Sequence, residues 1–587
     1  VKYAWMKEYY PDMYEKLKQY IAAGRWHISG ASWDANDPNM PSVESSIRNI
    51  LLGQEFYQKE FGVLSTDIML PDCFGFGNTL PSIAAHCGLI GFGTQKLKWR
   101  ENAFFPNGAK FPFYFGIWEG IDGSRVMATL DGGSYSYSPK EPIDHDEATI
   151  ARYADSPINA AYRYFGTGDI GGSVTPAGMR FIDQAQHNPD ASYNIKLATS
   201  DQMFKDYLWD ERLPVYQGEL LMDVHATGCY TSKVEMKNLN RRNEWLLGSV
   251  EAISTLADRL GALEYPASAI DESWKRVLWH QFHDDLTGTS IPDAYKFSYN
   301  DEYLVQRQMG AALETAMHRV AALMDTRTKG PPVLVYNPIS SISNDYVAME
   351  TVLPAGTRSV EVTGPNGRPV RSQTIKHTDG TSTVLFAATE QPYGLGVYDL
   401  RPSTKADAKA SALKVSYSGI ENRIYKISLD SHGNIASIWD KRFNRELVSS
   451  AKPFCLEYFS PDVSERWPSW EIRKDVIDST PEIITGEVRI TVEEMGSMRA
   501  VLKIQHKYKG SVFVQRIILT DGAQDERIDI VNTVDWQGEN ALVKASFPVS
   551  FKAREAVYDL GMAHIARGNN TNTQYEVFGH QWADLTS

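Results

Sequence analysis

The sequence predicts a multidomain protein of mixed α/β, α and β type: a parallel α/β barrel-like domain, then a helix bundle, then β-sandwich domains. Two observations predict this order. The 587 residues are too many for a single hydrophobic core, and the spacing of apolar residues changes twice along the chain. We expect the α/β domain at residues 1–215, the helix bundle at 216–330, a small β domain at 331–412 and a large β-sandwich at 413–587.

Helical and strand-like patterns alternate in the first part of the chain. Pro41 and Ser42 precede an amphipathic helix that should run to about Phe61. The segment TDIML (66–70) then reads as a short buried strand, LPSIAAHCGL (80–89) as a helix, and IGFGTQ (90–95) as a second strand. This alternation is typical of an α/β sheet or barrel with parallel strands.

The middle and last parts of the chain differ in the spacing of their apolar residues. Long helical patterns occupy residues 240–260, 273–286 and 304–324, which favours a helix bundle. After KGPPVLVYNP (329–338), short β-branched and aromatic runs alternate with Gly, Asn, Asp and Pro to the end of the chain. This pattern predicts β-sandwich units that begin near residue 330.

Composition excludes several classes of function. The formal net charge is -14 and no dense Lys/Arg run occurs, so nucleic acid is not an expected partner. No apolar run reaches about 18 residues, so we expect no membrane span. The four cysteines lack CxxC spacing and are expected to be free or structural thiols. The opening residues read as the middle of a helical region, so we expect that a piece is missing ahead of Val1.

Asp72 is the first candidate for a catalytic residue. It directly follows a predicted strand, and carboxylates at the carboxyl ends of α/β barrel strands are usual catalytic positions. Gly75 and Gly77 would let backbone and ligand approach closely. The alternative is an ordinary turn aspartate beside glycine, and spacing alone slightly favours that alternative.

A second candidate is WHQFHDDLTGTS at residues 279–290. On a continuous helix, His280 would share a face with His283 or with Asp284. A histidine next to carboxylates is typical of a zinc site or of general acid/base chemistry. A polar helix end explains the pattern equally well.

Two further segments carry isolated polar residues. Asp169 in GTGDIGG (166–172) could be a general acid, part of a phosphate loop or a turn residue; no GK[ST] follows, so it is no P-loop, and a turn is favoured. In GELLMDVHATGCYTSK (218–233), Asp223 and His225 would face the same way on a strand. A lone histidine is more often structural than a ligand.

These segments appear in an order that resembles a known family. WDANDPNMPSVESSIRNILLGQEFYQKEFG, LPDCFGFGNTLP, GFGTQKLKW, GTGDIGG, GELLMDVHATGCYTSK, HDDLTGTS and EVFGHQWADL resemble the successive motifs of glycoside hydrolase family 38 α-mannosidases. GTGDIGG and TQKLKW resemble its bacterial and cytosolic branch most closely. The matches span almost the whole chain, and the resemblance implies a mutarotase-like sandwich at its end.

The resemblance implies a role for each matched residue. Asp72 matches the nucleophile, which also binds zinc, and His283 matches a zinc-binding histidine. Asp284 matches an acid that bonds mannose hydroxyls, and Asp169 matches the position we assign to the general acid/base. The remaining matches would surround the sugar: Trp33, Asp37, Asn39, Glu44, Trp118, Asp122 and His225.

Two departures from the family pattern matter. The zinc site of the family also uses a His-x-Asp pair in an amino-terminal HxHxDxxW motif, which this sequence lacks. We therefore expect an amino-terminally truncated chain that holds two of the four ligands of one Zn²⁺ per subunit. Ala35 stands where relatives often have Glu, which we expect to alter specificity.

The resemblance predicts a retaining, exo-acting α-mannosidase that removes terminal α-linked mannose from glycans, with zinc holding the O2 and O3 of mannose. The expected partner is a mannose-containing oligosaccharide, with assembly into homo-oligomers left open. Two alternatives remain: a deacetylase-like metal-dependent hydrolase and a non-catalytic carbohydrate-binding protein. The compartment is open, with the bacterial periplasm or secretion favoured over the cytoplasm.

Overall fold

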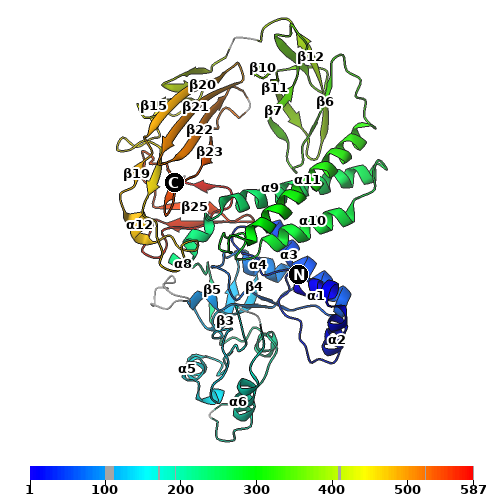
Figure 1. The fold of residues 1–587 in the computed structure, drawn as a ribbon, viewed down its shortest axis with the longest axis vertical. Helices are drawn as coiled ribbons and strands as arrows, with labels where there is room; N and C mark the ends of the chain where they lie inside the picture. Colours follow the sequence, from blue (N-terminus) through cyan, green and yellow to red (C-terminus); the bar gives the residue numbers. More distant parts are fainter. Residues whose placement is uncertain (99–110, 170–171, 192, 408–410, 523, 586–587) are drawn as a thin grey trace.

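The computed structural model describes residues 1–98, 111–169, 172–191, 193–407, 411–522 and 524–585. Figure 1 shows the α/β part below, long helices across the middle and β-sheets above. The predicted order of α/β, helical and β parts is confirmed.

The α/β part contains short strands and peripheral helices. Its helices are α1 (Lys2–Tyr9), α2 (Pro11–Ala22), α3 (Val43–Phe61), α4 (Leu80–His86), η1 (Lys96–Lys98), η2 (Ile143–His145), α5 (Glu147–Asp155), α6 (Pro176–Gln186) and α7 (Gln202–Asp206). Its strands are β1 (Asp67–Met69), β2 (Gly91–Gly93), β3 (Phe115–Glu119), β4 (Arg125–Thr129) and β5 (Val215–Gln217). The predicted start of α3 is confirmed, because the Ser42 side chain caps it by accepting the Ser45 N–H.

The sheet has the order β1-β2-β4-β3-β5. Strands β1, β2 and β4 are parallel, as predicted, but β3 runs antiparallel to β4. The short turn between Glu119 and Arg125 explains this, because a parallel crossover needs a dozen or more residues. The described strands therefore form an open mixed sheet rather than a closed barrel.

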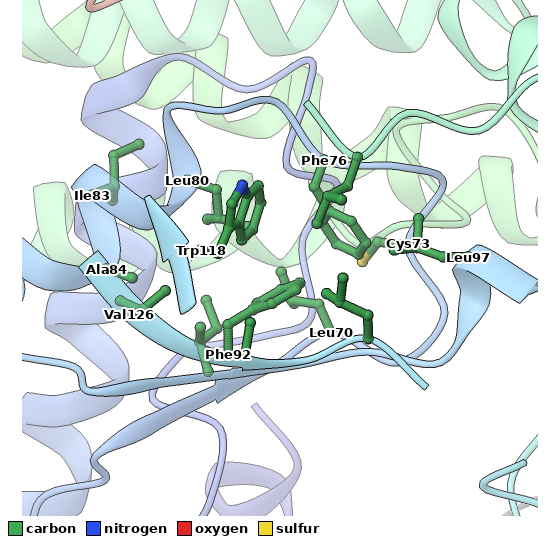
Figure 2. Packing of buried hydrophobic residues seen from close by; sticks show 14 of the residues in the cluster. Leu70, Cys73, Phe76, Leu80, Ile83, Ala84, Phe92, Leu97, Trp118 and Val126 are labelled. Carbon is green, nitrogen blue, oxygen red and sulfur yellow. The ribbon is translucent and has the colours of Figure 1, made fainter. Parts of the chain in front are cut away.

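An aromatic cluster fills the space against this sheet. Phe92 of β2 and Trp118 of β3 have ring centroids 5.1 Å apart, and Phe76 lies 5.0 Å from Phe92 (Figure 2). All three side chains are buried. This core supports the segment that follows β1, where Asp72 lies.

The helical part confirms the predicted bundle. It consists of α8 (Val224–Thr227), η3 (Gly228–Tyr230), α9 (Val234–Arg259), α10 (Ala267–His280) and α11 (Ala294–Ala321). Val250, Trp274, Val277 and Val305 are among the residues that fill its core. The strand expected around Asp223 is wrong: Asp223 precedes the short helix α8.

The β part begins with a small two-sheet unit. Its strands are β6 (Pro332–Tyr336), β7 (Ser343–Thr351), β8 (Ser359–Thr363), β9 (Pro369–Val370), β10 (Ser372–Lys376), β11 (Ser382–Glu390) and β12 (Leu395–Ser403). They form the sheets β10-β11-β7 and β6-β12-β8-β9, with Phe386 and Tyr398 in the core between them.

The last part is a larger β unit with one short helix. Its elements are β13 (Lys414–Ser416), β14 (Gly419–Glu421), β15 (Tyr425–Leu429), β16 (Ile435–Asp440), β17 (Arg445–Glu446), β18 (Cys455–Phe459), α12 (Lys474–Asp478), β19 (Glu482–Ile483), β20 (Glu487–Met495), β21 (Arg499–Tyr508), β22 (Ser511–Thr520), β23 (Asp529–Asp535), β24 (Leu542–Ser546), β25 (Glu555–Asp559), β26 (His564–Gly568) and β27 (Ala583–Asp584). Sheets β13–β17 and β20–β23 share one hydrophobic core.

Two composition-based expectations can be compared with the structure. The four cysteines are free thiols, as predicted. Within the described ranges, no helix has the length and hydrophobicity needed to cross a membrane.

Candidate active site

The carboxylate of Asp72 is paired with a buried lysine. Asp72 follows β1 and Lys96 follows β2; these strands are parallel neighbours, so both residues emerge at the same edge of the sheet. The Lys96 ammonium donates to Asp72 Oδ1 at 2.5 Å and lies 5.1 Å from the centre of the Phe74 ring. The Lys96 side chain is only 8% exposed, so the ion pair is shielded from solvent.

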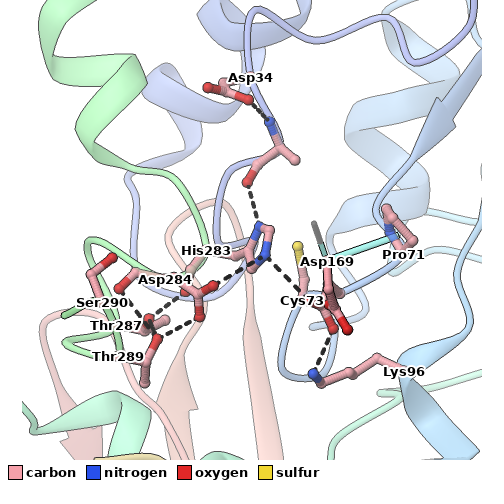
Figure 3. Close-up of polar contacts among 12 residues, drawn as sticks. Asp34, Pro71, Cys73, Lys96, Asp169, His283, Asp284, Thr287, Thr289 and Ser290 are labelled. Carbon is pink, nitrogen blue, oxygen red and sulfur yellow. Dashed lines mark hydrogen bonds and ion pairs between the residues drawn. The ribbon is translucent and has the colours of Figure 1, made fainter. Parts of the chain in front are cut away.

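His283 approaches the same carboxylate from the helical part (Figure 3). Its Nε2 lies 3.8 Å from Asp72 Oδ2 and 3.8 Å from Asp284 Oδ2. Its Nδ1 lies 3.1 Å from the Ala35 carbonyl oxygen. Since a carbonyl can only accept, Nδ1 carries a proton, and Nε2 is the ring nitrogen that faces the two carboxylates.

The helical placement predicted for this motif is wrong. Helix α10 ends at His280, and His283 and Asp284 lie in the turn that follows. Phe282 forms an isolated antiparallel bridge with Asn36, which replaces further helical hydrogen bonding. His280 points elsewhere, with Nδ1 at 2.7 Å from Asp285 Oδ2.

Asp284 is held by Thr289 and Ser290. Its Oδ1 accepts a hydrogen bond from the Thr289 hydroxyl at 2.7 Å, and its carbonyl accepts the backbone N–H groups of Thr289 and Ser290. The turn leaves Asp284 Oδ2 directed at His283. The carboxylate can therefore accept a donor from a ligand while its backbone stays fixed.

A tyrosine joins Asp72 to the glycine-rich segment. The Tyr135 hydroxyl lies 2.5 Å from Asp169 Oδ1 and 3.2 Å from Asp72 Oδ2. Because both contacts meet at one oxygen atom, the two carboxylate oxygens are less than about 6 Å apart, an upper limit that includes the spacing of about 5–5.5 Å used by retaining glycosidases. Asp169 is exposed, and its φ of 62° lies in the left-handed region favoured by turns.

The surroundings shift the pKa values of Asp72, His283 and Tyr135 in different directions. Burial raises the pKa of Asp72, but His283 and Lys96 outweigh it and lower the pKa to about 2. Burial lowers the pKa of His283, whereas Asp72 and Asp284 raise it above its ordinary value. Burial and then Asp169 raise the pKa of Tyr135, so its hydroxyl remains a donor at any working pH.

The donor geometry fits part of a zinc site. Zinc lies about 2.0–2.2 Å from nitrogen and oxygen ligands, so the 3.8 Å between Asp72 Oδ2 and His283 Nε2 suits two ligands of one ion. The described parts of the chain contain no group of three or more His, Cys, Asp or Glu side chains arranged to hold a metal. These residues therefore offer two zinc donors.

Asp37 and Asn39 support the site from behind. The Asn39 carboxamide donates to the Gly75 carbonyl and accepts the Gly77 N–H, both at 3.0 Å. Asp37 accepts the backbone N–H groups of Asn39 and Met40. Both side chains are buried, with exposures of 1% and 2%, and their described contacts fix the segment after Asp72; the predicted sugar contacts stay a prediction.

Three other residues matched to the sugar site lie elsewhere. Trp118 is 0% exposed and its indole donates to the Gly218 carbonyl, so it is a core residue. Asp122 lies in the turn between β3 and β4 and accepts a hydrogen bond from Ser82 of α4. This turn is at the sheet edge where β4 begins, opposite the edge where β1 and β2 end. Glu44 is an exposed partner of Arg48 on α3.

The last two matched residues pack between domains. Trp33 packs against the bundle core, with its ring 5.9 Å from Phe56. His225 is buried, with Nδ1 3.1 Å from Glu471 and its ring stacked on Trp470 of the C-terminal part. The ring of Phe74 lies between His225 and His283, with centroid distances of 6.0 and 6.1 Å.

Lys96 and Tyr135 were not predicted. A signal existed for Lys96, because a lysine directly after a buried strand needs an acid at the same sheet edge. Tyr135 lies in the long connection between β4 and α5. Its neighbours in sequence do not distinguish it from a tyrosine on an ordinary surface loop. Only the folded chain brings it between Asp72 and Asp169.

Three family models match successive parts of the chain. They are described as the glycosyl hydrolases family 38 N-terminal domain at residues 1–219, the alpha mannosidase middle domain at 224–329 and the glycosyl hydrolases family 38 C-terminal domain at 420–587. They occur in the order in which the motifs were found, and they confirm the resemblance.

Curated relatives and a solved structure agree. Alpha-mannosidase G of Dictyostelium discoideum is 28% identical over 100% of this chain and 56% of its own length. Human alpha-mannosidase 2C1 is 26% identical over 99% of this chain and 53% of its own, so the chain spans about half the length of these relatives. An alpha-mannosidase from Enterococcus faecalis V583 has a similar fold, with a TM-score of 0.78 at 16% identity, over 97% of this chain and 72% of its own. The chain belongs to glycosyl hydrolase family 38.

Proposed function

We propose that the protein carrying this chain is a retaining, exo-acting α-mannosidase. The observation that carries this proposal is the placement of Asp72 and Asp169 on one tyrosine hydroxyl. The resulting spacing of less than about 6 Å suits a nucleophile and an acid/base, whereas inverting enzymes separate their carboxyls by about 6.5–9.5 Å. The substrate class, terminal α-linked mannose on a glycan, is taken from the relatives named α-mannosidase.

In the proposed double displacement, the chain's own residues move the protons and form the covalent bond. Asp72 is ionised, with a pKa of about 2, and attacks the anomeric carbon while Asp169 protonates the departing oxygen. Asp169 then takes a proton from water, which attacks the mannosyl-enzyme and releases Asp72. Tyr135 holds the two groups in place through its hydroxyl, which donates to the Asp72 carboxylate and accepts from Asp169 while Asp169 is protonated.

We infer that Asp72 and His283 hold zinc, with further ligands from outside the described residues. When bound, the ion acts as a Lewis acid for the O2 and O3 hydroxyls of mannose, of which O2 is axial and distinguishes mannose from glucose. Asp284 accepts a hydrogen bond from a sugar hydroxyl. Elemental analysis should find about one zinc per full-length subunit and a large loss in His283→Ala; full zinc content in that variant would contradict the assignment.

The proposed nucleophile is tested in the full-length protein. Asp72→Asn should lower hydrolysis of an aryl α-mannoside by about 10³-fold or more, because the nucleophile is lost. Asp122→Asn is the matched control, since Asp122 lies at the opposite sheet edge. Proton NMR of the wild-type reaction should show α-mannose as the first product. Retained turnover in Asp72→Asn, or β-mannose first, would overturn the proposal.

A further inference from the structure

A buried ion pair connects the C-terminal part to the α/β domain. Arg567 of β26 donates from Nε and Nη2 to the two carboxylate oxygens of Glu219, at 2.9 and 2.6 Å. The side chains are 6% and 7% exposed. Such a bidentate, shielded pair is geometrically specific, because the planar guanidinium matches the carboxylate in one orientation.

Glu219 is adjacent in sequence to a residue that pairs with the Asp72 segment. Leu220 and Phe76 exchange two backbone hydrogen bonds, at 2.9 and 3.0 Å, and form an isolated antiparallel bridge. Phe76 is four residues beyond Asp72. A displacement of Glu219 is therefore passed through one residue and two hydrogen bonds to the segment that carries the proposed nucleophile.

A second contact reaches the same segment from the C-terminal part. The buried ring of Phe578 lies against Gly77, so that a Cβ added at Gly77 would be 3.0 Å from the ring edge. Arg567 also donates to the Phe578 carbonyl at 2.7 Å, and its guanidinium lies 5.1 Å from the ring centre. Asn39 holds Gly77 through a hydrogen bond to the Gly77 N–H.

We propose that Arg567, Glu219 and Phe578 are positioning residues, through which the C-terminal β domain sets the geometry of the segment from Asp72 to Gly77. Their described contacts are with one another and with the residues next to this segment, and Asp72 is not among them. Their action on turnover rests on the proposed function, but their action on the segment does not. Displacement of a reacting atom by about 1 Å can lower a rate by about 10²-fold.

The pair is best tested by removing both charges together in the full-length protein. A single substitution would leave one buried charge unpaired, at a cost of about 3–5 kcal/mol, and could unfold the protein. The double variant Glu219→Gln/Arg567→Met avoids this penalty. Arg516→Met is the matched control, because Arg516 makes a bidentate pair with Glu493 on the exposed face of the last β unit. Phe578→Ala and the conservative Phe578→Leu test the second contact.

Two readouts separate positioning from general stability. Hydrogen exchange of the peptide that contains Phe76 should become at least about tenfold faster in the double variant and unchanged in Arg516→Met. The kcat for an aryl α-mannoside should fall by about 10–100-fold with KM changed less than about threefold, and Phe578→Leu should retain more kcat than Phe578→Ala.

The two readouts also distinguish failure of this proposal from failure of the proposed function. Unchanged exchange at Phe76 in a folded double variant would overturn the positioning role, whatever the activity. Faster exchange in a protein whose wild type hydrolyses no α-mannoside would support the positioning role and overturn the proposed function. A kcat within about twofold of wild type in the double variant would overturn the action on turnover.

Discussion

The hydroxyl of Tyr135 provides a sharp test of the carboxylate geometry. Tyr135→Phe removes one oxygen atom that lies 2.5 Å from Asp169 and 3.2 Å from Asp72, and leaves the ring in place. A hydrogen bond to a charged group contributes about 1.5–3 kcal/mol. At about 1.4 kcal/mol per factor of ten, kcat/KM for an aryl α-mannoside should fall by about 10–150-fold.

The assay compares Tyr135→Phe with Tyr137→Phe, two residues away in the same loop. The Tyr137 ring lies 3.6 Å from the Arg163 guanidinium, so its substitution tests the loop without touching the two carboxylates. The loss in Tyr135→Phe should be larger for substrates with poor leaving groups, because Asp169 then needs to be well placed to donate its proton. Equal kcat/KM values in Tyr135→Phe and wild type would refute the reasoning.

Two further predictions concern stability. Trp118→Ala should cost about 3–5 kcal/mol in denaturant unfolding because the ring is fully buried, whereas Trp245→Ala, 60% exposed, should cost less than about 0.5 kcal/mol; similar costs would contradict the core assignment. Burial lowers the pKa of His280, but Asp285 and Asp301 outweigh it and raise the pKa to about 9. The contribution of the charged His280 to the free energy of unfolding is therefore complete below about pH 6.5 and is lost as pH rises through 9. The melting temperatures of wild type and His280→Gln should converge above pH 9. A difference that stays constant with pH would contradict this.

Local signals in the sequence predicted the secondary structure around the site. The cap of α3 at Ser42 and the strand before Asp72 depend on residues within a few positions of each other, so a short window contains their cause. The bundle helices were equally readable from their apolar spacing. The end of α10 at His280 was not, because the competing interaction is the bridge between Phe282 and Asn36, more than two hundred residues away.

The grouping of the site residues was only partly predictable. Asp72, Asp169, His283 and Asp284 do come together, although the chain separates Asp72 from His283 by most of two domains. The resemblance, rather than spacing, identified them. The antiparallel course of β3 places Asp122 at the opposite edge, and the local signal for that course is the turn between Glu119 and Arg125, which is too short for a parallel crossover.

Asp37 and Asn39 show how buried residues of a sequence motif support an active site. Asp37 orients Asn39, Asn39 holds the backbone of Gly75 and Gly77, and that backbone fixes the direction of Asp72. A carboxylate close to a lysine and a histidine needs such support, because its position as well as its identity decides whether it can attack. In this chain the buried Asp37 and Asn39 are therefore part of the scaffold of the Asp72 segment.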